Sequence, residues 1–168
     1  MKNIMLKHCK KEYIVCLMCN KLIVKGAAYL RGGEMINFTI YGDPKAKARP
    51  RVFSRNGRRM VFSPSARDEQ DFLTQALPYK PEKPLICPLG IEIKAYFPIP
   101  KAYSKAKREK ALKFEIRPAK RPDPDNIAKL VLDSLQGIFF LNDSQVVSLS
   151  VDKFYSDTPK TEVFITEA

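Results

Sequence analysis

The chain has 168 residues, 45% of them hydrophobic, which is enough for one domain with its own core and too little for two ordinary domains. Thirty lysines and arginines against 18 acidic residues give a formal charge of +12, which favours a polyanionic partner such as nucleic acid or an anionic membrane surface. The sequence has no apolar run of the roughly 18 residues that cross a bilayer and no recognisable secretory signal. We therefore expect a cytoplasmic protein without a membrane-spanning segment.

The first 34 residues differ in composition from the rest of the chain. They hold seven basic and two acidic residues and show no clear strand or helix period. The tetrapeptide Arg31-Gly-Gly-Glu34 can be encoded by a purine-rich tract, and such a tract directly before the ATG of Met35 resembles a bacterial ribosome-binding site. We expect residues 1–34 to be a translated leader, or else a disordered basic tail, and residues 35–168 to form the folded domain.

The cysteines do not form a disulfide framework, because three of the four lie within the first 19 residues. His8, Cys9, Cys16 and Cys19 could be written as a zinc site, since a C-x-x-C pair can place two thiolates on one ion. The second pair should come from a distant element, however, and His8 and Cys9 are adjacent. We therefore expect neither a disulfide nor a structural zinc ion.

From Met35 onwards, alternation and turn residues outline regular elements. Apolar and polar residues alternate over Ile36–Tyr41, and Gly42-Asp-Pro44 ends this predicted strand. The Asn56-Gly57 pair between two short apolar segments predicts a hairpin with basic side chains at its tip. Further strands are expected over 90–97, 145–155 and 161–166, and helices over 66–77, 104–113 and 123–136. The pattern predicts an α+β fold, a mixed sheet of four or five strands with helices packed on one face.

Acidic residues gather around the last predicted helix. Asp123 and Asp125 open this helix, Lys129 follows one turn after Asp125, and Asp143 stands where the chain returns as a strand. Structural roles could explain part of the pattern: Asp123 could cap the helix, with Pro124 at its first position, and Lys129 could pair with an acid four residues away. These roles explain the two acids at the helix start adequately, but they do not explain Asp143, where the chain returns as a strand, nor the basic segment directly before the helix.

The same residue types suit phosphodiester cleavage. Hydrolysis near neutral pH needs hard cations that neutralise the phosphate and activate water, and Mg²⁺ binds a few carboxylates together with its own waters. Asp123, Asp125 and Asp143 are therefore candidate metal ligands. Lys129 lies on the same helix face as Asp125, where its ammonium could stabilise charge that develops on the phosphate.

The run Arg121-Pro-Asp-Pro-Asp-Asn-Ile-Ala-Lys129, followed by Asp133-Ser-Leu135, Gly137 and Asn142-Asp-Ser-Gln-Val146, resembles the signature of the RusA-type Holliday-junction resolvases. Upstream, Gly42-Asp-Pro-Lys-Ala-Lys-Ala-Arg-Pro-Arg51 is similar to the basic segment that follows the first strand of that family. The resemblance covers about residues 35–166 and leaves residues 1–34 without a counterpart.

The resemblance implies a homodimeric, RusA-like endonuclease of DNA recombination and repair that cuts four-way junctions by paired symmetric nicks. It implies Mg²⁺ as cofactor, with Mn²⁺ as the alternative, and no small-molecule cofactor or membrane. The metal ligands would be Asp123, Asp125 and Asp143, and Lys129 the essential lysine. A prophage origin would suit the family.

Two features depart from the family pattern. Asn142-Asp143 stands where two acids are common, and the basic excursion over 101–120 is longer than in compact members. Because the second acid carries the catalytic role, we expect activity to persist. The alternatives are a catalytically inactive junction- or DNA-binding protein, and a nuclease that acts on forks, flaps or RNA.

Basic residues on both sides of the acidic motif are expected to bind DNA phosphates, with salt-sensitive affinity and little base readout. They are Lys45, Lys47, Arg49, Arg51, Arg55, Arg58, Arg59, Lys120 and Arg121.

Overall fold

The computed structural model describes residues 13–16, 21–24, 27–29, 35–55 and 57–168. In the N-terminal part, strands β1 (Tyr13–Cys16), β2 (Lys21–Val24) and β3 (Ala27–Tyr29) pair antiparallel in that order. The sequence pattern did not predict these strands. His8, Cys9 and Cys19 lie outside the described residues, and the expectation that residues 1–34 are a leader or tail stays a prediction.

A four-stranded mixed sheet forms the centre of the described domain. Its strands are β4 (Met35–Tyr41), β7 (Leu89–Pro98), β8 (Val146–Ser156) and β9 (Lys160–Glu167), in the order β4-β9-β7-β8. The pair β7–β8 is parallel, while β9 pairs antiparallel with both β4 and β7. Parallel strands require a crossover connection, and here residues 99–145 with their two α-helices supply it. The predicted mixed α+β fold is confirmed.

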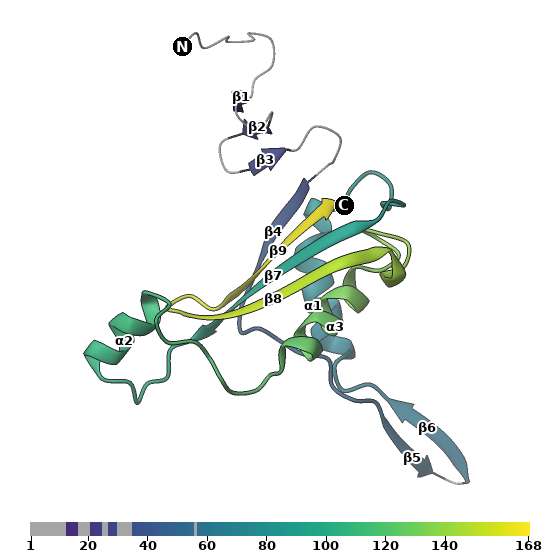
Figure 1. The fold of residues 1–168 in the computed structure, drawn as a ribbon. Helices are drawn as coiled ribbons and strands as arrows, with labels where there is room; N and C mark the ends of the chain where they lie inside the picture. The colour runs from purple at the N-terminus through teal and green to yellow at the C-terminus, as the bar shows by residue number, and fades with distance from the viewer. Residues whose placement is uncertain (1–12, 17–20, 25–26, 30–34, 56) are drawn as a thin grey trace.

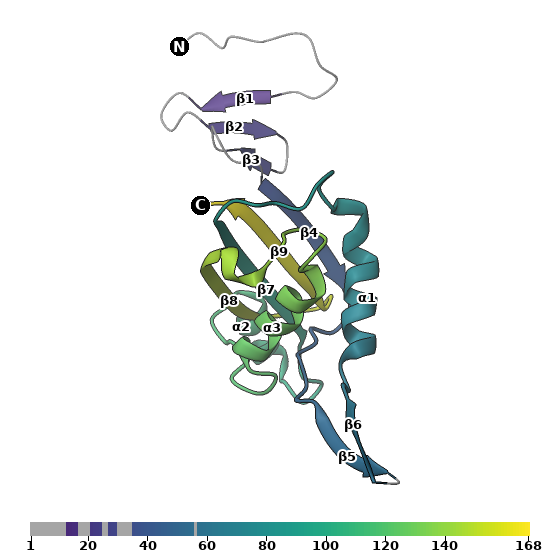
Figure 2. The same cartoon turned by 90° about the vertical axis from the view of Figure 1, so that its right-hand side faces the viewer.

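Two helices cover one face of this sheet, as Figure 2 shows. Helix α1 (Ala66–Ala76) packs against β4 and against α3 (Pro124–Leu135), and α3 also packs against β8. Every second residue of β7 from Leu89 to Phe97 is buried against this layer, as the alternation predicts. A 3₁₀ turn, η1 (Leu77–Tyr79), continues α1 past the predicted end at Leu77. The helix face of the sheet thus holds the core and fixes α3 in place.

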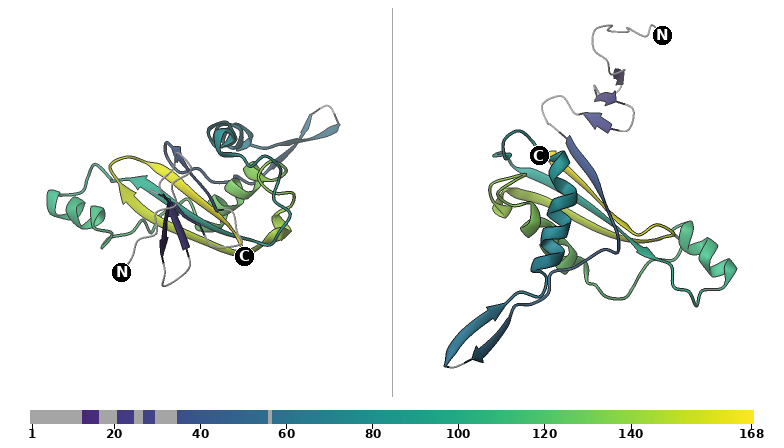
Figure 3. Two further views of the ribbon diagram at one scale, coloured as in Figure 1. Left: turned by 90° about the horizontal axis from the view of Figure 1, so that it is seen from above. Right: turned by 180° about the vertical axis from the view of Figure 1, so that it is seen from behind.

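Two segments project from the sheet in different directions (Figures 1 and 3). Strands β5 (Arg51–Arg55) and β6 (Arg58–Phe62) form the predicted hairpin, a two-stranded ribbon that leaves the body beyond the lower ends of α1 and α3 in Figure 1. Helix α2 (Lys105–Leu112) lies within the basic excursion on the other side of the molecule. No helix in the described ranges is long and apolar enough to cross a membrane.

Candidate active site

The start of α3 presents two carboxylates to solvent. Asp123 occupies the N-cap position with extended backbone angles (φ −78°, ψ 146°), yet its side chain makes no capping hydrogen bond. Asp125, in the first turn, accepts one hydrogen bond from Asn126 Nδ2 at 3.3 Å. Both side chains are exposed. The expected helix start at Asp123 is thus confirmed, while the carboxylate that could have served as the cap remains available to a ligand.

Lys129 lies one helical turn after Asp125 and is exposed. Among the described residues it forms no ion pair with Asp125 or Asp133. Asp133, the other acid within reach along the helix, instead pairs with Lys47. Within the described part of the chain, no ion pair therefore explains why Lys129 stands beside the two acids.

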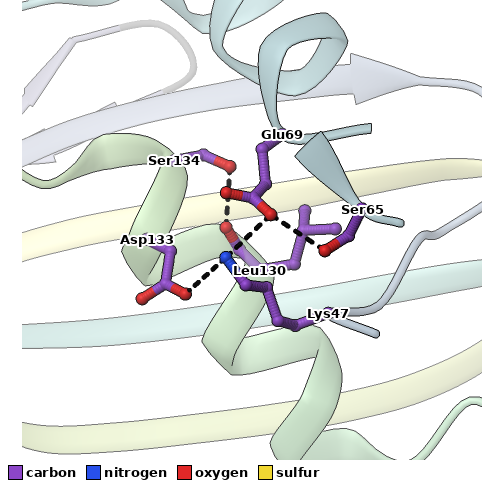
Figure 4. Close-up of polar contacts among 6 residues, drawn as sticks. All are labelled: Lys47, Ser65, Glu69, Leu130, Asp133 and Ser134. Carbon is purple, nitrogen blue, oxygen red and sulfur yellow. Dashed lines mark hydrogen bonds and ion pairs between the residues drawn. The ribbon is translucent and has the colours of Figure 1, made fainter. Parts of the chain in front are cut away.

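Lys47 bridges helices α1 and α3, as Figure 4 shows. Its ammonium lies 2.7 Å from Glu69 Oε1 on α1 and 2.9 Å from Asp133 Oδ2 on α3, and only 17% of its side chain is exposed. Burial alone would lower the pKa of Lys47, but hydrogen bonds and charge attraction from the two carboxylates outweigh it and raise the pKa. Ser65, at the N-cap position of α1, donates its hydroxyl to Glu69 Oε1 at 2.9 Å instead of capping the backbone.

The backbone adds a second link between the basic segment over residues 45–51 and helix α3. The Lys47 N–H donates to the carbonyl oxygen of Asn126 in the first turn of α3, at 2.8 Å. The chain that leads into β5 is therefore fixed directly beside Asp125. This contact could not be predicted from the sequence, because its two partners lie 79 positions apart and neither residue type is specific for it.

Lys153 supports the segment that enters α3 from the other side. Its ammonium, on β8, donates to the carbonyl oxygens of Lys120 and of Pro122, the latter at 2.9 Å. These bonds place the far end of β8 next to Asp123. Lys153 was missed in the sequence, since a lysine in a half-exposed strand carries no distinguishing pattern.

Asp143 lies at the opposite end of α3. It begins a short 3₁₀ turn, η2 (Asp143–Gln145), just before β8, and its side chain is exposed. Asn142 caps this turn: its Oδ1 accepts the Ser144 N–H at 2.9 Å, and its own N–H donates to Gln145 Oε1 at 2.8 Å. Gln145 also donates to the carbonyl of Leu85 at 3.0 Å. This capping role explains why an asparagine suits position 142.

The three aspartates do not converge within one chain. Helix α3 has twelve residues, so its ends lie roughly 18 Å apart. Asp123 and Asp125 stand at its first turn and Asp143 beyond its last. Throughout the part of the chain that the structure describes, no three His, Cys, Asp or Glu side chains lie close enough to share a metal ion. One chain by itself offers the Asp123–Asp125 pair.

The predicted DNA-binding residues fall into distinct settings. Arg49, Lys120 and Arg121 are exposed near the start of α3, and Lys45 pairs loosely with Asp68 at 3.6 Å. Lys47 is held in its double ion pair. Of the predicted residues on the β5–β6 ribbon, Arg51, Arg58 and Arg59 have exposed side chains. Arg55 lies on β5, but its side chain is outside the described part of the structure. The participation of these residues in DNA binding stays a prediction.

Comparison with known proteins gives two matches. The family model described as "Endodeoxyribonuclease RusA" matches residues 41–166. This range includes strands β7 and β8, nearly all of β9, both core helices and all four candidate catalytic residues, whereas β4 lies before it except for Tyr41. The chain is also 41% identical over 138 residues to the uncharacterized protein YqaN of Bacillus subtilis (strain 168). That match covers 80% of this chain and 97% of the relative.

Proposed function

Because the chain belongs to the RusA family of endodeoxyribonucleases, we propose that it is a metal-dependent endonuclease that resolves four-way DNA junctions by paired symmetric nicks. One observation supports this most: Asp123, Asp125 and Lys129 share the exposed start of α3. The basic segment over residues 45–51 is bonded to that helix start through Lys47, and Lys120 and Arg121 directly precede it. The proposed setting is DNA recombination and repair in the cytoplasm.

The donor chemistry of the site suits Mg²⁺, with Mn²⁺ as the alternative. Hard divalent cations take carboxylate oxygens, and Mg²⁺ needs only one or two of them beside its own waters. When bound, such an ion would neutralise the scissile phosphate and activate water. Asp123 and Asp125 would hold it, and the Lys129 ammonium would stabilise negative charge on the phosphate oxygens. Arg121 and Arg49 would orient the DNA backbone beside them.

The position of Asp143 supports a site that is completed by a second copy of the chain. Asp143 precedes the first residue of β8, whereas Asp123 lies next to Lys153 near the last residues of the same strand. If two β8 strands pair antiparallel about a twofold axis near Ser150, the start of each strand meets the end of the other. This pairing would carry the partner's Asp143 towards Asp123 and Asp125.

Strand β8 has the properties that such pairing requires. It is an edge strand of the sheet, with one side unpaired among the described residues. Val147 is 65% exposed and Leu149 45% exposed, although Leu149 lies beside the buried Ile91 on the helix face. An uncovered apolar edge strand is an established route to strand addition. We therefore propose a twofold homodimer through β8, with two active sites that each draw on both chains.

The experiment is a cleavage assay with end-labelled DNA. Wild-type protein and the Asp125→Asn variant are compared on a four-way junction, a fork, a flap, a linear duplex and an RNA hairpin, each with Mg²⁺ and with Mn²⁺. We expect symmetric nicks in the junction by the wild type and a loss of at least 100-fold in the variant, which loses a metal-ligating carboxylate. If the protein cleaved forks, flaps or RNA in preference to the junction, that nucleic acid would be its substrate in place of the four-way junction. Tight junction binding without cleavage under any condition would make the protein a non-catalytic binder.

A further inference from the structure

The β5–β6 ribbon exposes more apolar surface than any packing role explains. Val52, Phe53, Met60, Val61 and Phe62 are all between 45% and 71% exposed. An isolated two-stranded ribbon is marginally stable in water, and clustered exposed apolar side chains mark a binding surface.

Strand register divides these side chains between two faces. Directly opposite residues of a ribbon point to the same side, and alternate residues of a strand share a face, so Arg51, Phe53, Arg58, Met60 and Phe62 lie on one face. The pair Val52–Val61 occupies the other. We call the set Arg51, Phe53, Arg58, Met60 and Phe62 the aromatic face. On it, two phenyl rings and a thioether lie between guanidinium groups.

The charge of the surrounding segment selects the partner. From Pro44 to Ser65 the chain carries seven basic residues and no acidic one. A second copy of so basic a ribbon would be repelled, whereas a polyanion would be attracted. Guanidinium groups bind phosphates and phenyl rings stack on bases, and this combination is typical of surfaces that bind nucleic acid with accessible base faces.

The attachment of the β5–β6 ribbon to helix α3 determines which part of a bound DNA the ribbon can contact. The backbone bond from Lys47 to Asn126 and the Lys47 ion pairs fix its base to the first turn of α3. Each strand has five residues, so the ribbon extends roughly 17 Å beyond that base. A DNA strand held at Asp123 and Asp125 would therefore present its neighbouring nucleotides to the ribbon.

We propose that the aromatic face enters the branch point and stacks on bases that the branch leaves unstacked. This inference rests on the proposed function, because it takes branched DNA as the substrate. In a continuous duplex the neighbouring base pairs cover each base face, so the phenyl rings have little base surface to stack on and add little binding free energy. At a branch the faces are accessible, and apolar side chains that insert between bases can hold the DNA open. The aromatic face thus determines the preference for branched over linear DNA.

The test compares two variants of the full chain that differ only in the face of the ribbon they alter. Phe53→Ala/Phe62→Ala removes the rings, and Val52→Ala/Val61→Ala is the matched control on the opposite face. Binding is measured by anisotropy with Ca²⁺ in place of the catalytic metal, on a four-way junction and on a linear duplex. A 2-aminopurine beside the branch reports unstacking. We expect wild type and control to bind the junction preferentially and to raise 2-aminopurine fluorescence.

The aromatic-face variant should keep its duplex affinity, lose about tenfold in junction affinity and lose the fluorescence rise. Equal behaviour of the two variants would overturn the proposal. Dissociation of a dimer by Phe53→Ala/Phe62→Ala in sedimentation would overturn it in favour of a second copy as the occupant. Failure of the wild type to cut the junction with Mg²⁺ or Mn²⁺ would instead refute the proposed function, and it would leave the binding and fluorescence results interpretable.

Discussion

Single residues show how two capping positions of this chain differ. Asp123 occupies an N-cap position without using its carboxylate, whereas Asn142 uses both its side chain and its backbone to cap η2. A helix-capping role thus accounts for the asparagine and not for the aspartate. The residue types of the candidate site could be predicted from spacing and from family resemblance. Their partners could not, because Lys47 and Asp133 become neighbours only after β4, α1 and α3 have packed.

The bridge made by Lys47 predicts a stability effect that an adjacent lysine lacks. Lys47→Met leaves Glu69 and Asp133 without their shared cation, so the free energy of unfolding should fall by about 1–3 kcal/mol. Lys45→Met is the matched control: the Lys45 side chain is 57% exposed and its pair with Asp68 spans 3.6 Å, so the free energy of unfolding should change by no more than about 0.5 kcal/mol. Urea denaturation of both variants measures the difference. Equal effects would contradict a structural role for Lys47.

Lys47 also predicts how the stability of the protein depends on pH. Folding raises the pKa of Lys47, so its contribution to stability is fully present below the unfolded pKa and is lost as pH rises through the folded pKa. The stability difference between wild type and Lys47→Met should therefore stay constant up to about pH 10 and shrink above it. A difference that widened with rising pH would contradict the assignment.

At the level of elements, alternation and turn signals predicted the strands and helices of residues 35–168. They could not give the direction of β8 beside β7, because a strand pattern is the same in both orientations. The distance between Asp143 and the other acids was equally hidden. Sequence spacing placed all of them around one helix, and only the fold shows that they lie at its opposite ends.

The exposed edge of β8 makes a prediction about assembly. Val147→Lys places a charge in the proposed interface and should raise the dimer dissociation constant at least about tenfold. Val61→Lys is the matched control, since Val61 is a similarly exposed strand valine on the β5–β6 ribbon. Sedimentation velocity across a concentration series measures both. A dimer that resists Val147→Lys and dissociates with Val61→Lys would locate the interface on the ribbon.

At the scale of the whole molecule, the net charge of +12, the two projecting basic segments and the separated aspartates fit one arrangement. In a twofold dimer each start of α3 would face one DNA strand, and two equivalent sites would produce two symmetric nicks. The positive charge would attract any polyanion, whereas the spacing of the two sites in the proposed dimer would select branched DNA. In the proposed dimer, the assembly would therefore determine the reaction as much as the residues of either chain do.

Mixing two inactive subunits tests this account most directly. Asp125→Asn and Asp143→Asn proteins are each expected to leave a labelled four-way junction uncut. In a heterodimer with shared sites, one site carries both changes, and the other combines the intact Asp125 of one chain with the intact Asp143 of its partner. After the two variants are unfolded together and refolded, we predict cleavage of one strand per junction. If wild type cuts and the mixture stays inactive, each site lies within one chain and the shared arrangement is wrong.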